Sequence, residues 1–232
     1  MIAIHQSQFI PWVPYFFKIY KSDQFVILDN VQYQKNGLQN RNKIKTPQGS
    51  QWLTIPVSVK LGDKINEIQI SNLNYNKLLK TISANYNKSP FFVTIYESLN
   101  EILTKNNGKL IDLNNDLLNF VNSFINNSTT FHYSGNIKTH SKRDNLVIEI
   151  IKHFNETEYL AGKGSLNYMN LEKFKDHGIK VFTFDYSYIE YPQLWNNQQG
   201  FIADLSIVDL LFNNLTMLEN YINNNGKIYC VN

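Results

Sequence analysis

The sequence of 232 residues contains a single cysteine, Cys230, which excludes a disulfide framework. Its first residues, Met-Ile-Ala-Ile-His, lack the charged lead and the long apolar run of a secretory signal. No stretch reaches the roughly 18 apolar residues that a membrane-spanning helix needs. We therefore expect a soluble protein of the cytoplasm.

Signatures of several common functional classes are also missing. There is no cysteine pair and no His-Glu-x-x-His for zinc, and no Gly-x-Ser-x-Gly for a serine hydrolase. The net charge of +3, from 22 Lys and Arg against 19 Asp and Glu, is too even to indicate a polyanion-binding surface. The sequence thus predicts no metal site and carries no nucleic-acid signature.

Arginine is scarce, because only Arg41 and Arg143 stand among the 22 basic residues. Glycine (10) and proline (6) are also few while asparagine reaches 33, a bias that indicates a skewed genome more than a function. A guanidinium offers phosphate or carboxylate a planar fork that lysine lacks, so Arg41 is a candidate anion-binding residue. Arg143 opens a predicted helix, where a cation is unfavourable, and its role stays open.

Residues 1–30 predict a parallel β-α-β unit: a strand from Ile2 to His5, a helix at about 11–21 and a second strand ended by Asp29. Prolines in the first turn mark the start of the helix. The unit puts His5 and Asp29 at neighbouring strand ends, on the edge where open α/β sheets bind ligands.

Further along, turn dipeptides and alternating residues predict an antiparallel β insertion at 31–71. Helical spacing predicts a helical segment at 72–157, and a C-terminal α/β part follows at 158–232 with a helix at about 206–223. We expect an α/β fold in which a Rossmann-like parallel sheet carries a β-hairpin insertion and a helical middle segment. The whole chain, 1–232, is expected to form one domain.

Several polar residues could carry chemistry, and each has a structural alternative. Polar groups before a helix N-terminus suit a phosphate-bearing ligand, although His5 could equally be a satisfied histidine at a strand end. Asp29 could orient an amine, a ribose or a metal, or form an Asx-turn. The run from Gly162 to Ser165 could be a small anion nest or a plain turn. Asp209, on an apolar helix, is either paired in the core or facing a site.

Taken together, the motifs resemble the WbqC-like protein family, in order, along nearly the whole chain. The matching segments are His5-Gln6-x-Gln8-Phe9-x-Pro11-Trp12, Asp29-x-Val31-Gln32, Lys35, Asn40-Arg41-Asn42, Trp52-Leu-Thr-x-Pro56, Tyr159-Leu-x-Gly162-x-Gly164, Tyr191-Pro-Gln193 and Ser206-Ile-x-Asp209. The chain departs from the family pattern at Ser7, where members usually have proline, and at Asn214, where glycine is common.

The resemblance implies a role in bacterial O-antigen or other surface-polysaccharide biosynthesis, because members are encoded in such gene clusters and some have been proposed to be glycine or amino-acid transferases. With Gln8 added from the polar segment after the first strand, it marks these candidate substrate-binding residues: Gln6, Gln8, Gln32, Lys35, Asn40, Arg41, Asn42, Gly162, Tyr191, Gln193 and Asp209. The implied partners are a sugar nucleotide and an acyl or aminoacyl donor.

Our leading hypothesis is a transferase that acylates the amine of a nucleotide-linked amino sugar. His5 or Asp29 would accept the proton of the attacking amine. The side-chain amides of Asn40, Asn42 or a glutamine would meet the oxyanion, and Arg41 with Lys35 would hold a pyrophosphate or the donor carboxylate. No cofactor is required, although ATP or an activated acyl donor is compatible.

Two alternatives from other classes stay open. An ATP-dependent nucleotidyl or adenylyl transferase of the same pathway would use the first β-α-β unit for a nucleotide, although its usual His-x-Gly-His signature is not met by His5-Gln6-Ser7-Gln8. A non-catalytic protein that binds a sugar nucleotide would tolerate conservative changes at Asp29 and Arg41.

Overall fold

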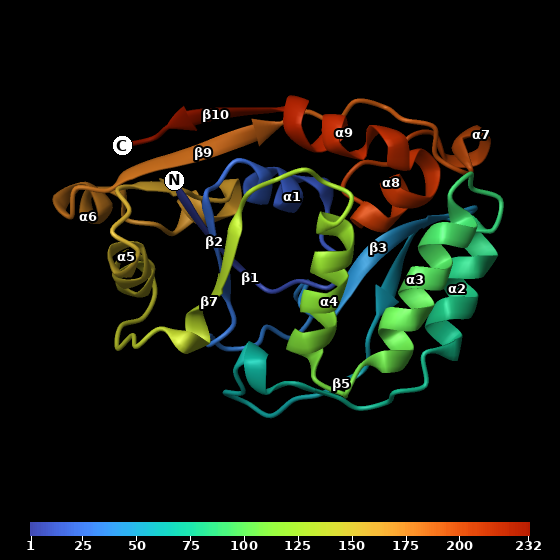
Figure 1. The fold of residues 1–232 in the computed structure, drawn as a ribbon, viewed down its shortest axis with the longest axis horizontal. Coiled ribbons are helices and arrows are strands. Elements are labelled where there is room, and N and C mark those ends of the chain that lie inside the picture. The colour runs from blue at the N-terminus through green and yellow to red at the C-terminus, as the bar shows by residue number, and fades with distance from the viewer.

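The computed structural model describes residues 1–232 and is built around a six-stranded, mostly parallel sheet (Figure 1). Its strands are β1 (Ile2–Gln6), β2 (Gln24–Leu28), β7 (Thr130–Tyr133), β8 (Glu158–Leu160), β9 (Lys180–Tyr186) and β10 (Gly226–Cys230). They lie in the order β10-β9-β8-β1-β2-β7, and only β10 is antiparallel to its neighbour. The five parallel strands thus have the Rossmann order, and the predicted fold class is confirmed.

Two strands of this sheet were not predicted. β7 lies inside the segment 72–157 that helical spacing assigns to helices, and it pairs in parallel with β2. β10 pairs with β9 and closes the opposite edge. Both are short, and β7 has no run of apolar residues, so local pattern gives them little signal.

The antiparallel insertion predicted at 31–71 is present as two small sheets outside the main one. They are formed by β3 (Arg41–Thr46) with β4 (Gly49–Thr54), and by β5 (Val57–Ser58) with β6 (Gln69–Ile70). The first is the hairpin that carries the predicted Asn40-Arg41-Asn42 segment.

Helices cover both faces of the main sheet. They are α1 (Val13–Tyr20), α2 (Asn76–Tyr86), α3 (Phe92–Lys105), α4 (Leu110–Asn122), α5 (Asp144–His153), α6 (Leu171–Asp176), α7 (Asn196–Gln199), α8 (Ile207–Asn214) and α9 (Leu218–Asn224). The single helix expected at about 206–223 is interrupted by a 3₁₀ turn at Leu215–Met217, which separates α8 from α9. None of the helices combines the length and the apolar character of a membrane span.

The buried apolar residues form two clusters, one on each face of the sheet. The larger cluster contains Ala3 of β1 and joins α1 to α2, α3, α4, α8, α9 and the β3–β4 hairpin. The smaller one contains Ile2 and Ile4 and lies under α5 and α6. Because side chains of a strand alternate, β1 contributes to both cores and is buried on both faces.

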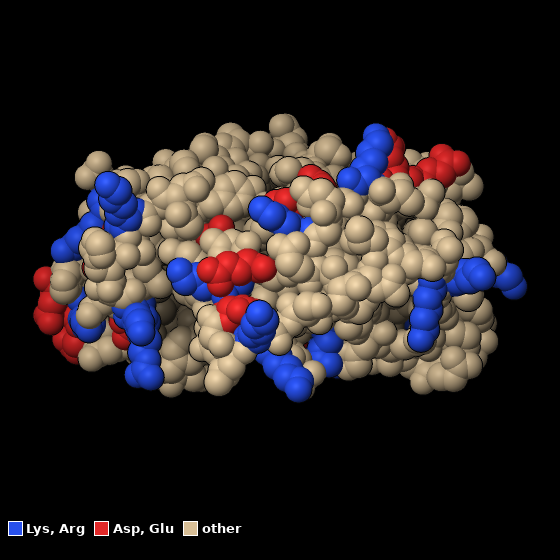
Figure 2. Space-filling view, turned by 90° about the horizontal axis from the view of Figure 1, so that it is seen from below, with Lys and Arg blue, Asp and Glu red and all other residues tan.

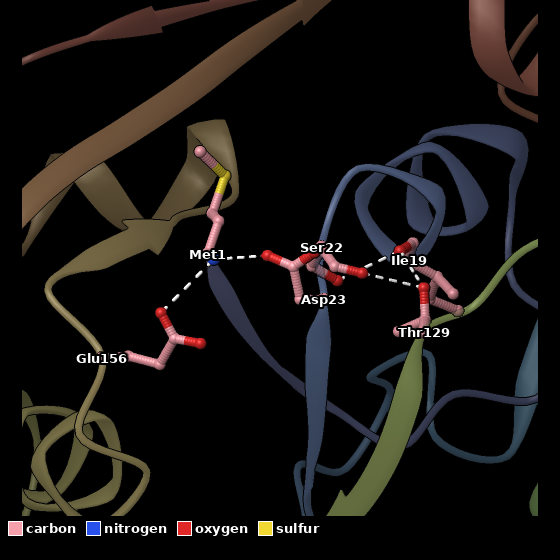
Figure 3. Close-up of polar contacts among 6 residues, drawn as sticks. All are labelled: Met1, Ile19, Ser22, Asp23, Thr129 and Glu156. Atoms are coloured by element: carbon pink, nitrogen blue, oxygen red, sulfur yellow. Dashed lines mark hydrogen bonds and ion pairs between the residues drawn. The ribbon is translucent and has the colours of Figure 1, made fainter.

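Polar contacts hold the amino-terminal edge of the sheet (Figure 3). The α-amino group of Met1 lies 2.6 Å from a carboxylate oxygen of Asp23 and 3.3 Å from one of Glu156. The hydroxyl of Thr129 is 2.8 Å from the carbonyl oxygens of both Ile19 and Ser22. The turn between α1 and β2 is thereby joined to the start of β7.

Candidate functional site

The strand order creates a crossover beside β1. The chain passes from β1 to β2 and β7 on one side, then returns through α5 to β8 on the other side. Pairing between β1 and β8 covers only Ile2 with Tyr159 and Ala3 with Leu160, and the chain diverges beyond it. In open α/β sheets the space outside the carboxyl ends of two such strands is where ligands bind.

The loop after β1 contains a strained residue. Ile10 has a backbone φ of 39°, a region that β-branched side chains avoid. Its carbonyl accepts hydrogen bonds from Asn42 Nδ2 at 2.7 Å and from Ser206 Oγ at 2.9 Å. Such strain persists only where the surroundings hold it, and it clusters at functional sites. The loop is therefore a candidate part of a site.

Amide side chains cluster at the start of this loop. Gln39 Nε2 donates to Gln6 Oε1 at 2.8 Å, and Asn114 Nδ2 donates to the hydroxyl of Ser7 at 3.0 Å. Three buried amide oxygens, on Gln8, Gln39 and Asn114, have no hydrogen-bond partner. Buried polar atoms are nearly always paired with protein groups or ordered water, so these three acceptors are open to an N–H or O–H donor from water or from a ligand. Gln39 and Asn114 were not predicted as site residues.

His5 lies at the end of β1, partly buried against the ring of Tyr15 at a centroid distance of 4.8 Å. Its Nδ1 is 3.1 Å from the carbonyl of Gln6 and donates to it. Burial, together with the charge of Lys18, lowers the pKa of His5 to about 3. The imidazole is therefore neutral and weakly basic at neutral pH.

Lys18 is a further polar group that sequence reasoning missed. Its side chain extends from α1 into the interior of the protein. There Nζ donates a hydrogen bond of 2.7 Å to the carbonyl of Ile4 and lies 5.8 Å from the centre of the Tyr159 ring. Burial lowers the pKa of Lys18 to about 7, and no carboxylate forms an ion pair with it. The signal in the sequence is its position within Val-Pro-Tyr-Phe-Phe-Lys-Ile-Tyr, a helix that is otherwise apolar.

Asp29 lies where β2 and β7 end. Its Oδ1 accepts hydrogen bonds from the hydroxyl of Ser134 at 2.9 Å and from the backbone N–H of Gly135 at 2.7 Å, while Oδ2 has no bond within the protein. A Cβ at Gly135 would lie 3.2 Å from both carboxylate oxygens and 3.0 Å from Asn66 Nδ2, so glycine lets the chain approach Asp29.

The surroundings of Asp29 are acidic. The pKa of Tyr133, on β7, is raised by burial and then by the charges of Asp29, Asp112 and Asp116. Asp112 and Asp116 come from α4, and the pKa of Asp116 is itself raised by burial and by Asp112. Three carboxyl groups therefore act on one region, which favours a cationic ligand group there.

The side chains of Asn40, Arg41 and Asn42 alternate in direction at the start of β3, so they have different roles. Asn40 and Asn42 are buried and donate to main-chain carbonyls, Asn40 to that of Ile55 at 2.7 Å. Arg41 points the other way, with its guanidinium 4.2 Å from the centre of the Trp52 ring. Lys43 Nζ is 5.2 Å from the same ring, and the buried Nε of Arg41 has no partner. Arg41, Trp52 and Lys43 form an exposed aromatic and cationic surface.

The remaining predicted residues near the sheet edge are solvent-accessible. Gln32 and Lys35 are exposed on the segment that leads to the hairpin. Gly162 follows β8, and a Cβ added there would meet no atom within 4 Å. Lys163, beside it, forms an ion pair with Asp185 at 2.5 Å.

Tyr191, Gln193 and Asp209 lie apart from this edge, in a buried network of their own. The carboxylate of Asp209 accepts hydrogen bonds from the hydroxyls of Tyr86 and Tyr191, each at 2.8 Å. Burial raises the pKa of Asp209, and these two donors and Lys45 oppose that rise. Lys45 Nζ donates to Gln193 Oε1 at 2.8 Å, so the network links β3, α2, α8 and the segment before α7.

The structure thus brings His5, Gln6, Gln8 and Asp29 to one edge, and the hairpin is tied to that edge through Asn42 and Gln39. Figure 2 shows the molecule from the side toward which β2 and β7 run; acidic and basic side chains lie close together over its middle, and others stand toward both ends. We call this edge, with the loop after β1 and the ends of β2 and β8, the crossover site.

The fold and this edge define an α/β protein with a Rossmann-type sheet. The chain belongs to the WbqC-like protein family, whose model matches residues 6–218, which confirms the resemblance predicted from the motifs. It is 36% identical over 217 residues to the uncharacterized protein Rv1507c of Mycobacterium tuberculosis, covering 91% of this chain and 93% of that protein. No solved structure matches the chain.

Proposed function

We propose that the protein is a cytoplasmic transferase of bacterial surface-polysaccharide biosynthesis, which moves an aminoacyl or other acyl group onto the amine of a nucleotide-linked amino sugar. The observation that supports this function is the acidic environment of Asp29, formed with Asp112 and Asp116 around Tyr133 at the crossover site. An amino sugar arrives as an ammonium ion, which such an environment attracts.

The chemistry assigns the proton acceptor to Asp29. The ammonium first gives a proton to Oδ2 of Asp29. The free amine nitrogen then attacks the acyl carbon, a C–N bond forms, the bond to the donor's leaving group breaks, and the second nitrogen proton leaves with that group. Ser134 and Gly135 donate hydrogen bonds to Oδ1, which fixes the carboxylate. Oδ2 accepts no hydrogen bond from the protein. His5, with its pKa lowered to about 3, is a weak base.

The oxyanion of the tetrahedral intermediate would be met by Gln8. The side-chain amides of Asn40 and Asn42, which the sequence also suggested, donate to the carbonyls of Ile55 and Ile10 and are therefore engaged in holding the chain. Gln8 forms no side-chain hydrogen bond, so its N–H groups are available for a developing negative charge. The nucleotide would contact Arg41 and Trp52, by ion pairing and by stacking.

The test is an assay of the purified protein with amino-sugar nucleotides and with aminoacyl and acyl thioester donors, read by mass spectrometry of the sugar. We expect an acylated product from the wild type and its loss in Asp29→Asn. The exposed Asp176→Asn is the matched control and should retain activity. Absence of acylated sugar with every donor would exclude this function.

A second candidate is an ATP-dependent nucleotidyl or adenylyl transferase, which the Rossmann strand order favours because such sheets hold nucleotides at the crossover. Release of pyrophosphate from ATP that depends on a carboxylic acid or a sugar phosphate would distinguish it from direct acyl transfer. Full activity of Asp29→Asn and Arg41→Lys in a glycan complementation assay would instead indicate a non-catalytic binding protein.

A further inference from the structure

The side-chain amine of Lys18 lies inside the protein, and the chain supplies no counter-ion for its charged form. Lys18 is 2% exposed, and its Nζ donates one hydrogen bond, to the carbonyl of Ile4. The titratable groups that face it are His5 on β1 and the ring of Tyr159 on β8, and neither is a carboxylate. A buried ammonium is costly without a partner, and burial accordingly lowers the pKa of Lys18 to about 7. An anion bound nearby would favour the charged form, so an anion is the partner that this amine lacks.

The side-chain nitrogen of Lys18 lies close to the crossover between β1 and β8. Ile4 is the first residue of β1 beyond its pairing with β8, so Nζ lies where the two strands begin to separate. From Ile4 to the end of β1 at Gln6 is two residues, or about 7 Å along a strand. On the β8 side, the absence of atoms around Gly162 leaves the backbone open to a ligand. An anion bound between Gln6 and Gly162 would therefore lie close to the charge of Lys18.

We propose that Lys18 supplies the positive charge of an anion subsite between the ends of β1 and β8, and that the ligand group is a diphosphate. This inference rests on the proposed function, since a nucleotide-linked sugar carries a diphosphate. An ammonium acts as a compact point charge suited to phosphate, and sheets with this strand order hold phosphates at the crossover. Burial lowers the pKa of Lys18 to about 7, so the amine takes up a proton when the anion arrives.

The experiment is a calorimetric titration of the wild-type protein with inorganic pyrophosphate at pH 8, in two buffers of different ionisation enthalpy. We expect binding with uptake of close to one proton. Lys18→Met should bind about 10- to 50-fold more weakly, as one Coulomb interaction at this distance predicts, and take up no proton. Lys21→Met, at the end of the same helix, is the matched control and should bind as the wild type does. Equal binding by Lys18→Met, or binding by the wild type without proton uptake, overturns the proposal.

Thermal unfolding separates this role from a purely structural one. Lys18→Met should be at least as stable as the wild type, because folding buries an amine that has to lose its proton or remain without a counter-ion, and the variant removes that cost. A lysine that serves only to hold the Ile4 carbonyl would instead give a lower Tm with unchanged pyrophosphate binding, which contradicts the proposal. If Lys18→Met does not fold, proton uptake by the wild type decides alone.

The subsite and the proposed function fail in different ways. Pyrophosphate binding that depends on Lys18, in a protein that transfers no acyl group, would support the subsite and exclude the function. Acyl transfer in which Lys18→Met leaves the KM for the sugar nucleotide unchanged would support the function and overturn the subsite.

Discussion

Asn42 holds the backbone of Ile10 through a hydrogen bond of 2.7 Å to its carbonyl, and so connects the hairpin to the strained loop at the crossover site. The two residues lie 32 positions apart in the chain. Ser206 donates to the same carbonyl from the start of α8. A loop that is unfavourable by itself is thereby fixed from two independent elements.

Removal of both hydrogen bonds to the Ile10 carbonyl should therefore lower stability by more than the sum of the two single removals. Asn42→Ala and Ser206→Ala should each lower the free energy of unfolding by about 1–2 kcal/mol, since each leaves the carbonyl with one donor. The double variant should lose more than the sum, because it leaves the buried carbonyl unpaired. Urea unfolding of the four proteins measures this coupling, and strict additivity would show that the two donors act separately.

His5 should make the protein sensitive to acid. Its pKa is about 3 in the folded protein and 6.5 when unfolded, so the unfolded chain binds more protons between these values. Stability should therefore fall as the pH drops below 6.5, by about 3 kcal/mol at pH 4. His5→Gln should remove this part of the slope in urea unfolding between pH 7 and 4. The exposed His177→Gln is the control, and an unchanged slope in His5→Gln would contradict the assignment.

Tyr191 should stabilise the fold through Asp209. Tyr191→Phe removes one of the two hydroxyl donors to the buried carboxylate, which should cost about 1.5–3 kcal/mol. The folded-state pKa of Asp209 is raised, so its contribution to stability is present at low pH and is lost as the pH rises. Loss of one hydroxyl donor in Tyr191→Phe raises the pKa of Asp209 further. The loss in free energy of unfolding relative to the wild type, measured by urea unfolding, should therefore be larger at pH 8 than at pH 5.

The control for Tyr191 is Tyr168→Phe, whose side chain is exposed and should leave stability unchanged. An equal deficit at both pH values would mean that Tyr191 contributes by packing alone.

Gly135 should be needed to position Asp29. In Gly135→Ala the added methyl group would press on both Asp29 oxygens and on Asn66, which should cost about 1–2 kcal/mol of stability and lower the proposed transferase activity. Gly164→Ala adds the same group where no atom lies within 4 Å, and it should match the wild type in stability. Wild-type behaviour of Gly135→Ala would mean that Asp29 has room to move.

Local signals in the sequence were sufficient for the first β-α-β unit, because Pro14 in the first turn and two apolar runs mark its elements within 30 residues. They were not sufficient for β7. Its residues Thr130–Tyr133 become a strand through parallel pairing with β2, a contact about a hundred positions away. The 3₁₀ turn between α8 and α9 contains no proline or glycine that would mark a helix end, so the helical spacing predicted a single helix.

For the candidate site, the motifs indicated segments, several of which the fold brings to one edge of the sheet, but they did not indicate which contacts each residue makes. The alternation of β3 decides that Asn40 and Asn42 point inward and that Arg41 points toward Trp52, and this requires the pairing of β3 with β4. Asp209 has the paired core position that we had considered as an alternative to a ligand site. Lys18 lies on the buried face of α1, and its meaning depends on the crossover between β1 and β8, which no local pattern contains.

The pairing of β1 also has a consequence for biosynthesis of the chain. This strand leaves the ribosome first, at residues 2–6, whereas its second neighbour, β8, is made only at residues 158–160. Until then one edge of an apolar strand stays open, and exposed strand edges recruit other chains. Nascent or truncated chains that end before β8 should therefore aggregate, because β1 can pair along both edges only once residues 158–160 have been made.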